Sequence, residues 1–490
     1  MGSIWMEHCT PVPRPALYGK TEAEVAVVGG GMAGILIALF LHERGKRVVV
    51  LEADRVGGGQ TACTTAKVTS QHGAIYADLI RRFGWEKAKM YADIHQRAIG
   101  QFRRISDQYN IDCDLERTDA ILYSFVHEEA IHRETEAALA LGLPASFTTH
   151  VDLPMRICGA LRFTDQAQLH PLKLLYPLAD LLTVYERSPV EEVDGHRLVT
   201  PKGSVLAEKI VFATHYPLLN KKGFYFARLH QERSYAIALE NVTPPSGMYY
   251  GYEPYAFSFR SYKGRLILGG GNHRTGENSR GGKYELLRQG AQTLFSQGKE
   301  VAHWSAQDCI TASGVAYIGP LSGAMPHCYV ATGFHKWGMT GAMAAAEILS
   351  AQICDGGHPQ EAIFDPRSPV QQRPGKILSE GSHAIKGLSR RVIHGVLPLP
   401  QEIPIGHGAV AEVEGKQMGV YRASAEEYYA VDLACPHLGC RLEWNPDEKT
   451  WDCPCHGSRF DYQGRLIANP AQKPLHTCNL PHATEQPKKS

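Results

Sequence analysis

The hydrophobic pattern near the N-terminus predicts a β–α–β unit. Residues 24–29 and 46–52 are short apolar runs of strand type, and the segment between them has a glycine turn and then a helical stretch to about Arg44. Strands that alternate with helices in this way are typical of an α/β domain with a parallel sheet. Residues 329–354 repeat the order of strand, glycine turn and helix.

Beyond the β–α–β unit, the pattern predicts first helices, then strands, and finally a linker and a separate small domain. Two long amphipathic helices are expected near 76–109 and 126–142, and residues 160–275 then read mainly as short strands rich in Tyr, Phe, Val and Ile, as in an antiparallel sheet. Residues 366–399 are rich in Pro, Gly, Ser and basic residues and predict a linker. Beyond it, alternating runs such as 409–413 predict a small all-β module. We therefore expect an N-terminal tail (1–20), a large domain (21–365), the linker (366–399) and a small domain (400–490).

Composition narrows the class of protein. Lys+Arg of 51 against Asp+Glu of 50 leaves no basic excess for nucleic acid. The longest apolar run, Met32 to Leu41, is far shorter than the ~20 residues of a spanning helix, so no membrane anchor is expected. Residues 1–20 lack the apolar core of a signal peptide. These features favour a cytoplasmic enzyme.

The glycine turn has a specific pattern. Gly29-Gly30-Gly31-Met32-Ala33-Gly34 satisfies G-x-G-x-x-G between a strand and a helix, and Glu52 ends the next strand. Gly29 permits the turn, Gly31 admits a pyrophosphate, Gly34 allows close packing, and an acid at this distance accepts hydrogen bonds from a ribose. The alternative is a glycine-rich turn in a core. The order of elements favours a dinucleotide site that includes Ala33.

Two further stretches favour FAD over NAD. Residues 53–67 supply backbone donors and hydroxyls for more phosphate and the flavin edge, and residues 331–340 open a helix whose N–H groups suit the negative charge of a reduced flavin. The candidate FAD residues in these stretches are Gln60, Thr61, Thr64, Thr65, Gly333, Trp337, Gly338, Met339 and Thr340.

These motifs resemble the flavoprotein oxidases of the D-amino-acid, glycine and sarcosine oxidase family over about residues 22–365. Besides the stretches above, the resemblance rests on residues 207–215 and 314–319. It implies a Rossmann-like FAD-binding domain with an antiparallel substrate domain, and it makes Val190 a candidate on the adenine side.

The substrate residues depart from that family. Where its amino-acid oxidases commonly hold the substrate carboxylate with an arginine, an ungapped count gives Asp308, which would repel a carboxylate and attract an ammonium. This favours a small amine, unless Asp308 only caps a turn or pairs with an arginine. His335 and Lys336 are expected near the flavin, where they could tune it or activate oxygen, or they could be surface residues of the turn. Tyr249 and its aromatic neighbours, with Arg260, could line a substrate cavity or form plain core.

The C-terminal region carries the strongest motif. The motif consists of Cys435-Pro-His437-Leu-Gly-Cys440 and Cys453-Pro-Cys455-His456-Gly-Ser458, with the ligand spacing C-x-H, 15 residues, then C-x-x-H. Two thiolates on one iron and two imidazoles on the other make a Rieske [2Fe–2S] centre. Zinc is the alternative for such ligands, but the additional cysteines and the Gly-Ser pair fit it less well.

This region resembles the Rieske proteins of quinol-oxidising cytochrome complexes over about residues 400–478. The resemblance implies that Cys435, His437, Cys453 and His456 hold the cluster, that Cys440 and Cys455 form a disulfide, and that Ser458 donates to a bridging sulfide. Phe460 stands where those proteins usually have a tyrosine, so one hydrogen bond to sulfur is missing. We therefore expect a potential below the top of the ~ −150 to +300 mV Rieske range.

Three functions are compatible with these cofactors. The first is an enzyme that oxidises a small amine or amino acid at FAD and passes electrons to the cluster and an external one-electron acceptor. The second is an electron-transfer component that feeds a partner oxygenase, although a second glycine fingerprint for a pyridine nucleotide is missing. The third is a redox sensor. A Rieske oxygenase is disfavoured, because His127 and His132 lie in a Glu-rich helical stretch typical of a solvated face.

Overall fold

The computed structural model describes residues 2–7, 9–368 and 400–478, and the chain divides into two compact units. The first unit comprises Met1–Gly223, Ser234–Asn272 and Tyr284–Arg373. The second comprises Phe224–Arg233, His273–Lys283 and Pro374–Ser490. The predicted linker, 366–399, lies for the most part outside the described residues. No described helix is long and apolar enough to cross a membrane.

The first unit contains the predicted α/β sheet. Strand β1 (Gly19–Val28) pairs in parallel with β2 (Val48–Leu51), and α1 (Met32–Glu43) connects them and ends before Gly45, whose φ of 78° breaks the helix. The strand order is β16-β17-β10-β1-β2-β7, and in addition β9 pairs with β10 and β8 pairs with β9. The remaining strands are β7 (Thr183–Tyr185), β8 (Glu192–Asp194), β9 (Arg197–Thr200), β10 (Gly203–Phe212), β16 (Tyr317–Ser322) and β17 (Met325–Thr332).

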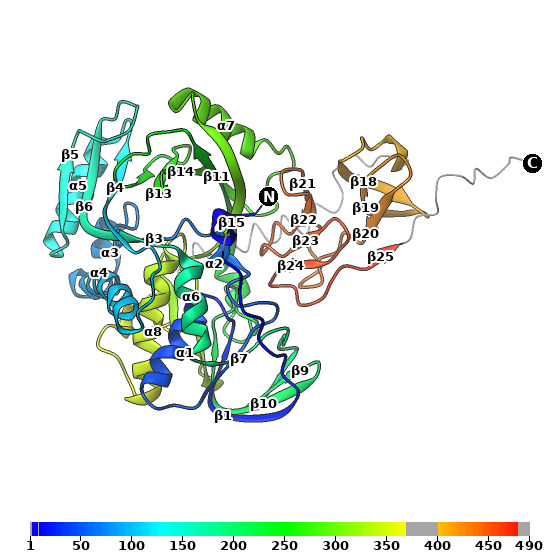
Figure 1. Ribbon diagram of the computed structural model, residues 1–490. Helices are drawn as coiled ribbons and strands as arrows, with labels where there is room; N and C mark the ends of the chain where they lie inside the picture. The colour runs from blue at the N-terminus through cyan, green and yellow to red at the C-terminus, as the bar shows by residue number, and fades with distance from the viewer. Residues whose placement is uncertain (1, 8, 369–399, 479–490) are drawn as a thin grey trace, which may run out of the picture. The chain divides into compact units, whose positions relative to one another are not determined.

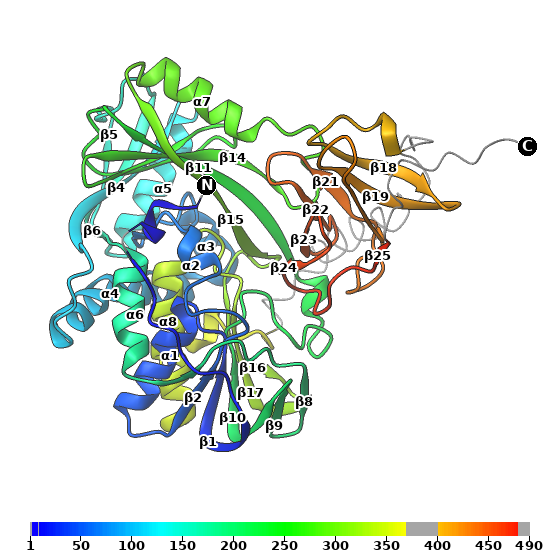
Figure 2. The same cartoon turned by 45° about the vertical axis from the view of Figure 1, so that its right-hand side comes forward.

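Two apolar helices cover this sheet. Helix α1 packs beside α8 (Gly338–Cys354), and both are drawn against the strands in Figures 1 and 2. Both helices are buried on nearly all sides, as expected for helices with few polar positions. Their N-termini follow the strands β1 and β17, so both point their free N–H groups toward the carboxyl edge of the sheet. That edge is where ligands bind in such sheets.

A second, nine-stranded sheet completes the first unit. Its order is β15-β11-β14-β13-β12-β4-β6-β3, with β5 beside β6. The strands are β3 (Lys67–Val68), β4 (Glu116–Ser124), β5 (Ala145–Thr148), β6 (Gly159–Gln168), β11 (Leu229–Glu240), β12 (Met248–Gly251), β13 (Ser258–Tyr262), β14 (Arg265–Arg274) and β15 (Lys299–Thr311). Strands β11 and β14 extend into segments of the second unit. The sheet is mainly antiparallel, as the sequence predicts, although β12 and β4 run in parallel.

The helices differ from the sequence prediction in three places. The helix expected over 76–109 is two helices, α3 (Tyr76–Phe83) and α4 (Trp85–Gln108), because Gly84 lies between them with a φ of 82°. Helix α6 (Pro171–Asp180) interrupts the region expected to be strands, with Pro171 in its first turn. Beyond that region lies a helix that the sequence did not predict, α7 (Lys283–Leu294). The helix expected over 126–142 is α5 (Glu128–Ala140), and shorter turns are α2 (Gln60–Cys63), η1 (Ile4–Met6), η2 (Tyr225–Ala227) and η3 (Glu361–Ile363).

The second unit contains the predicted small all-β module. One four-stranded sheet has the order β18-β19-β20-β25, and the other has the order β21-β22-β23-β24. The strands are β18 (Gly408–Val413), β19 (Lys416–Arg422), β20 (Tyr428–Val431), β21 (Glu443–Asn445), β22 (Thr450–Asp452), β23 (Arg459–Asp461), β24 (Leu466–Ala468) and β25 (Thr477–Cys478), preceded by η6 (Pro400–Glu402). The fold class is therefore α/β with an antiparallel sheet, joined to a small all-β domain.

Candidate flavin and iron–sulfur sites

The glycine turn between β1 and α1 has the close packing that its sequence requires. A Cβ atom on Gly34 would lie 1.8 Å from the Gly29 carbonyl oxygen, so no larger residue fits there. Gly29 itself has a φ of 112°. The Glu52 carboxylate accepts a hydrogen bond of 2.6 Å from the Gly30 N–H, and burial raises its pKa. The turn and the acid therefore lie in contact at the edge of the sheet.

The second predicted stretch lies against this turn. The Thr61 hydroxyl accepts a hydrogen bond of 3.0 Å from the Met32 N–H, at the start of α1. The neighbouring Gln60 side chain accepts one of 2.6 Å from the Gln307 N–H on β15. Val190, the adenine-side candidate, is buried. The candidates of residues 60–65 therefore connect the first turn with the antiparallel sheet.

The third predicted stretch surrounds a small cavity at the start of α8. The cavity has a volume of about 90 Å³ and is lined by Gly333 and Trp337 together with His72, Tyr91 and His95. The His72 ring stacks on Trp337 with centroids 4.9 Å apart, and its Nε2 atom lies 3.1 Å from the Thr340 hydroxyl. Residues Gly338–Thr340 form the first turn of α8, where backbone N–H groups are free of helical partners. The three histidine and tyrosine residues belong to no motif, so the sequence did not point to them.

The three catalytic candidates lie near each other on β15 and the turn after β17. The Lys336 ammonium is 2.9 Å from the Asp308 carboxylate, and the Ser234 hydroxyl is 3.5 Å from the same carboxylate. His335 has a φ of 54°, and its Nε2 atom lies 2.9 Å from the Thr311 hydroxyl. A substrate ammonium would have to compete with Lys336 for Asp308. The roles of these three residues stay predictions.

The aromatic residues considered for a substrate cavity are divided between several environments. Tyr249 is buried in a hydrophobic cluster, whereas Tyr255 is 67% exposed. Tyr250 meets Trp337 edge-to-face, with ring centroids 5.4 Å apart. Arg260 is 1% exposed and donates to Gln168 and to two backbone carbonyls, so its guanidinium serves the packing of the sheet. Of this set, Tyr250 is the residue that borders the start of α8.

The predicted cluster ligands lie in two loops of the second unit. Cys435 and His437 follow β20, and Cys453 and His456 lie between β22 and β23. Short backbone bonds close both loops: Cys435 N–H donates to Cys440 O, and Cys453 N–H donates to the Ser458 carbonyl, each at 2.8 Å. The two loops are therefore rigid turns at the ends of strands.

The side chains of these loops converge. The rings of His437 and His456 have centroids 4.9 Å apart. A hydrogen bond from the Cys453 thiol lowers the pKa of Cys435, which favours the thiolate that binds metal. Burial lowers the pKa of His456 to about 3, which keeps it as the neutral imidazole that ligates metals. Its Nδ1 atom is buried and has no hydrogen-bond partner in the part of the chain that the structure describes. These donors fit a cluster with two sulfur and two nitrogen ligands.

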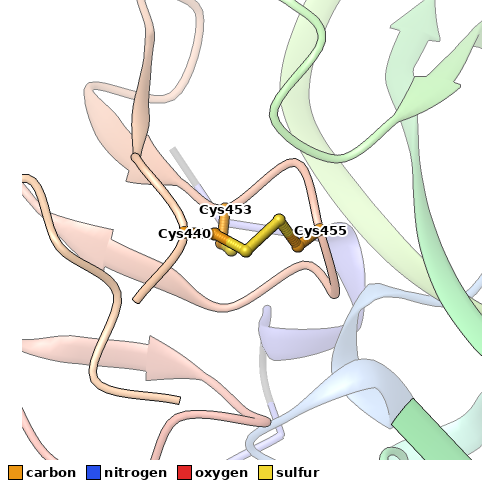
Figure 3. A group of neighbouring side chains, drawn as sticks. All are labelled: Cys440, Cys453 and Cys455. Carbon is orange, nitrogen blue, oxygen red and sulfur yellow. A yellow bond between two sulfur atoms is a disulfide. The ribbon is translucent and has the colours of Figure 1, made fainter. Parts of the chain in front are cut away.

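The additional cysteines form the predicted disulfide. Cys440 and Cys455 are joined across 15 residues of sequence, and Cys453 lies beside them (Figure 3). The sulfur atoms of the three residues lie within 4.8 Å of one another. The Ser458 hydroxyl also makes a hydrogen bond with Cys435, so it faces the sulfur of this predicted ligand.

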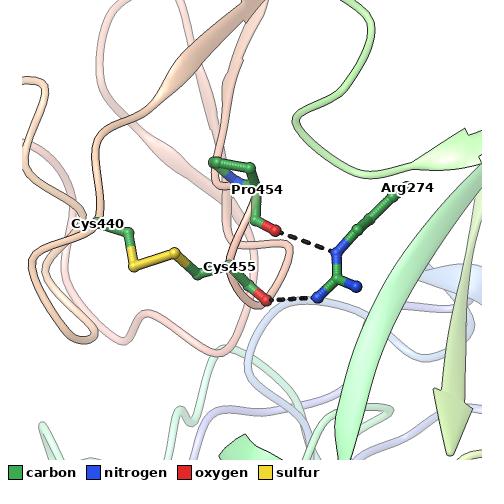
Figure 4. The surroundings of a disulfide bond; sticks show 4 residues. All are labelled: Arg274, Cys440, Pro454 and Cys455. Atoms are coloured by element: carbon green, nitrogen blue, oxygen red, sulfur yellow. Dashed lines mark hydrogen bonds between the residues drawn. A yellow bond between two sulfur atoms is a disulfide. The ribbon is translucent and has the colours of Figure 1, made fainter. Parts of the chain in front are cut away.

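Two segments from the middle of the chain hold the second ligand loop. Arg274 donates to the carbonyls of Pro454 and Cys455, each at 3.2 Å (Figure 4). Gln231 donates to the carbonyls of His456 and Asn469, at 2.8 and 2.9 Å. Arg274 is the last residue of β14 and Gln231 lies in β11, about 180 and 225 positions before the loop that they hold. Nothing in the local sequence predicts these contacts.

The same two segments also contact other residues of the small all-β domain. The ring of His456 makes a hydrogen bond with the backbone of Phe226. A Cβ atom on Gly276 would lie 2.5 Å from the Pro454 nitrogen, so the backbones are in close contact. Arg233 forms an ion pair of 2.8 Å with Glu448 and is 1% exposed. Segments 224–233 and 273–283 therefore belong to the compact unit that carries the predicted cluster ligands, and we call them the clamp segments.

Comparison with known proteins assigns the family of the larger region. Residues 24–352 match the family described as FAD dependent oxidoreductase, abbreviated DAO. The chain belongs to this family. Residues 396–479 match the Rieske [2Fe-2S] domain. The cofactors of this chain are accordingly FAD and a [2Fe–2S] cluster, and a zinc site at Cys435–His456 is no longer an alternative.

Individual proteins show the same combination or the same fold. The Bacillus subtilis (strain 168) protein described as Rieske 2Fe-2S iron-sulfur protein YhfW is 36% identical over 490 residues, which cover 95% of each chain. The gamma-glutamylputrescine oxidoreductase of Escherichia coli (strain K12) is 28% identical over 217 residues, which cover 41% of this chain and 51% of that one. The solved structure of L-proline dehydrogenase from P. horikoshii has a TM-score of 0.61 at 18% identity and covers 71% of this chain and 98% of that one. The last comparison shows the fold alone.

Proposed function

We propose that this protein oxidises a small amine or amino acid at FAD and passes the electrons one at a time, through the Rieske cluster, to an external acceptor. The observation that supports this most strongly is the presence of both cofactors on one chain. FAD accepts electrons in pairs and a Rieske cluster carries one, so the combination suits a dehydrogenase that delivers single electrons. The proteins similar to this one by sequence or fold include enzymes named for amine and amino-acid substrates.

The described residues support this proposal at three points. Gly29–Gly34, with Glu52, would hold the adenosine and pyrophosphate end of FAD. The first turn of α8 would receive negative charge on the reduced flavin through its N–H groups. Asp308 and Lys336, which form an ion pair, would contribute fixed charge near the substrate. FAD, when bound, supplies the two-electron acceptor; the chain binds and orients the substrate. The partner would be an external one-electron acceptor protein, and the expected compartment is the cytoplasm.

An anaerobic panel tests the proposal. Purified holoprotein is mixed with glycine, sarcosine, L-proline, putrescine or gamma-glutamylputrescine, and separately with NADH, while flavin absorbance is recorded. We expect at least one amine to bleach the flavin and NADH to leave it oxidised. Bleaching by NADH alone would instead identify an electron-transfer component.

A further inference from the structure

A buried lysine lies between the predicted flavin residues and the antiparallel sheet. Lys67 is the first residue of β3 and is separated by Ala66 alone from the candidate FAD residues Thr64 and Thr65. Its Nζ atom donates a hydrogen bond of 2.9 Å to the Tyr249 carbonyl. The same atom lies 6.0 Å from the centre of the Tyr250 ring, and that ring meets Trp337 at the start of α8. Lys67 therefore joins the second and third predicted flavin stretches.

The charge on this lysine is not balanced. In the part of the chain that the structure describes, no carboxylate forms an ion pair with Lys67. The charged group that acts on it is Arg260 of β13, which is itself buried and repels a second cation. Glu116 of β4 accepts a hydrogen bond from Gln168 and attracts Arg260, and it forms no ion pair with Lys67 in the described part of the chain. From β12 the neighbours are the uncharged Tyr249 and Tyr250.

Such an arrangement costs stability. A cation taken out of water without a partner is strongly unfavourable, and the group responds by losing its proton more easily. Lys67 as a whole residue is half-buried, whereas its ammonium end is buried. This burial, together with repulsion from Arg260, lowers the pKa of Lys67 to about 7. Methionine would fill similar space without this cost. Buried, unbalanced titratable groups of this kind are concentrated at functional sites.

We propose that Lys67, in its neutral form, is the base that takes a proton from the ammonium group of the substrate. The substrate N–H bond breaks, an Nζ–H bond forms, and the nitrogen keeps its lone pair. The neutral amine can then release hydride from its carbon to FAD and become an iminium ion, while Lys67 returns the proton to solvent. This inference rests on the proposed function and adds the residue that prepares the substrate.

A substrate-free experiment tests the position and ionisation of Lys67. In holoprotein without substrate, the midpoint potential of FAD is measured against pH from 5 to 9. We expect a change of slope near pH 7, because the flavin senses the lysine charge, and we expect this change to disappear in Lys67→Met. We also expect Lys67→Met to unfold at a higher temperature than the unmodified protein at pH 6, where the buried charge is present. A lower unfolding temperature, or an unchanged slope, would mean that Lys67 only anchors the Tyr249 carbonyl.

A kinetic experiment tests the role as a base. With the panel amine that bleaches the unmodified protein fastest, we expect flavin reduction to accelerate as pH rises through about 7 and to slow by about 100-fold or more in Lys67→Met. Lys67→Arg keeps the charge but cannot act as a base near neutral pH, so we expect it to be equally slow. Normal reduction in Lys67→Arg would overturn the proposal and indicate that the cation binds a substrate carboxylate. Lys46→Met, which removes a lysine paired with Glu24, is the control and should be unchanged. If no amine bleaches the flavin, the proposed function fails, whereas the substrate-free experiment still decides the placement of Lys67.

Discussion

Arg274 gives the sharpest prediction about how the cluster loop is held. The change is Arg274→Gln, which shortens the side chain and removes its charge while keeping a polar end. Arg274 donates to two backbone carbonyls of the ligand loop, both at 3.2 Å. We expect the loop to lose both hydrogen bonds and the cluster to be released at a lower temperature.

The magnitude follows from these two contacts. Hydrogen bonds from a charged donor contribute about 1.5–3 kcal/mol each, and a length of 3.2 Å lies at the weak end of the normal range. Two bonds of about 1.5 kcal/mol give roughly 3 kcal/mol in the free energy of unfolding. The described part of the second unit has about 100 residues. For a domain of that size, 1 kcal/mol corresponds to at least about 4 °C in the unfolding midpoint. The expected fall is therefore roughly 10 °C or more for release of the cluster.

Visible circular dichroism of the oxidised cluster follows this release on heating, and flavin absorbance is recorded in the same sample. Arg274→Lys retains a charge and can replace one of the bonds, so we expect an intermediate midpoint. The control is Arg288→Gln, which breaks a surface ion pair of 2.8 Å with Glu300 and should change the midpoint by no more than a few degrees. A midpoint for Arg274→Gln within about 2 °C of the unmodified protein would refute the claim that the clamp segments hold the loop.

Three other substitutions test separate parts of the account. Gly34→Ala places a Cβ atom 1.8 Å from the Gly29 oxygen and should abolish FAD binding, seen as protein that yields no flavin on denaturation but keeps the visible absorbance of its cluster. Gly100→Ala in α4, where nothing lies within 4 Å of the added Cβ atom, should bind FAD normally. Cys455→Ser opens a disulfide that closes a 15-residue loop, so we expect the free energy of unfolding to fall by about 3 kcal/mol and the cluster to be lost at a lower urea concentration. Loss of the cluster at an unchanged urea concentration would show that the disulfide does not stabilise the cluster domain. Cys453→Ser should remove the reduced-state paramagnetic signal and leave the flavin spectrum intact, and a retained Rieske signal would exclude Cys453 as a ligand.

The parts of the fold that could be predicted are those in which short-range pattern determines structure. The glycine turn, its strand and its helix lie within 35 residues, and each has a steric or electrostatic reason to be where it is. The same holds for the ligand loops, because Cys435 to His456 lie within 22 residues and their spacing reflects one cluster. The disulfide came from resemblance, and the structure confirms it.

The parts that could not be predicted depend on contacts between distant segments. Arg274 and Gln231 appear as ordinary strand residues in the sequence, and only the folded chain brings them to the cluster loop. The pairing of Asp308 with Lys336 changes what the carboxylate can bind, although nothing in either segment indicates the partner. Lys67 likewise ends a stretch of hydroxyl residues, and its surroundings, in which no described carboxylate pairs with it, are formed by strands 50 to 190 residues away.

The most direct test of the account is whether electrons from an amine reach the cluster. Holoprotein is mixed anaerobically with the panel amine that bleaches the flavin, frozen after increasing times and examined by electron paramagnetic resonance, with Cys453→Ser in parallel. The account predicts that the reduced Rieske signal grows as the flavin bleaches, and that the variant bleaches without that signal. A flavin that is fully reduced while the cluster stays oxidised would contradict it.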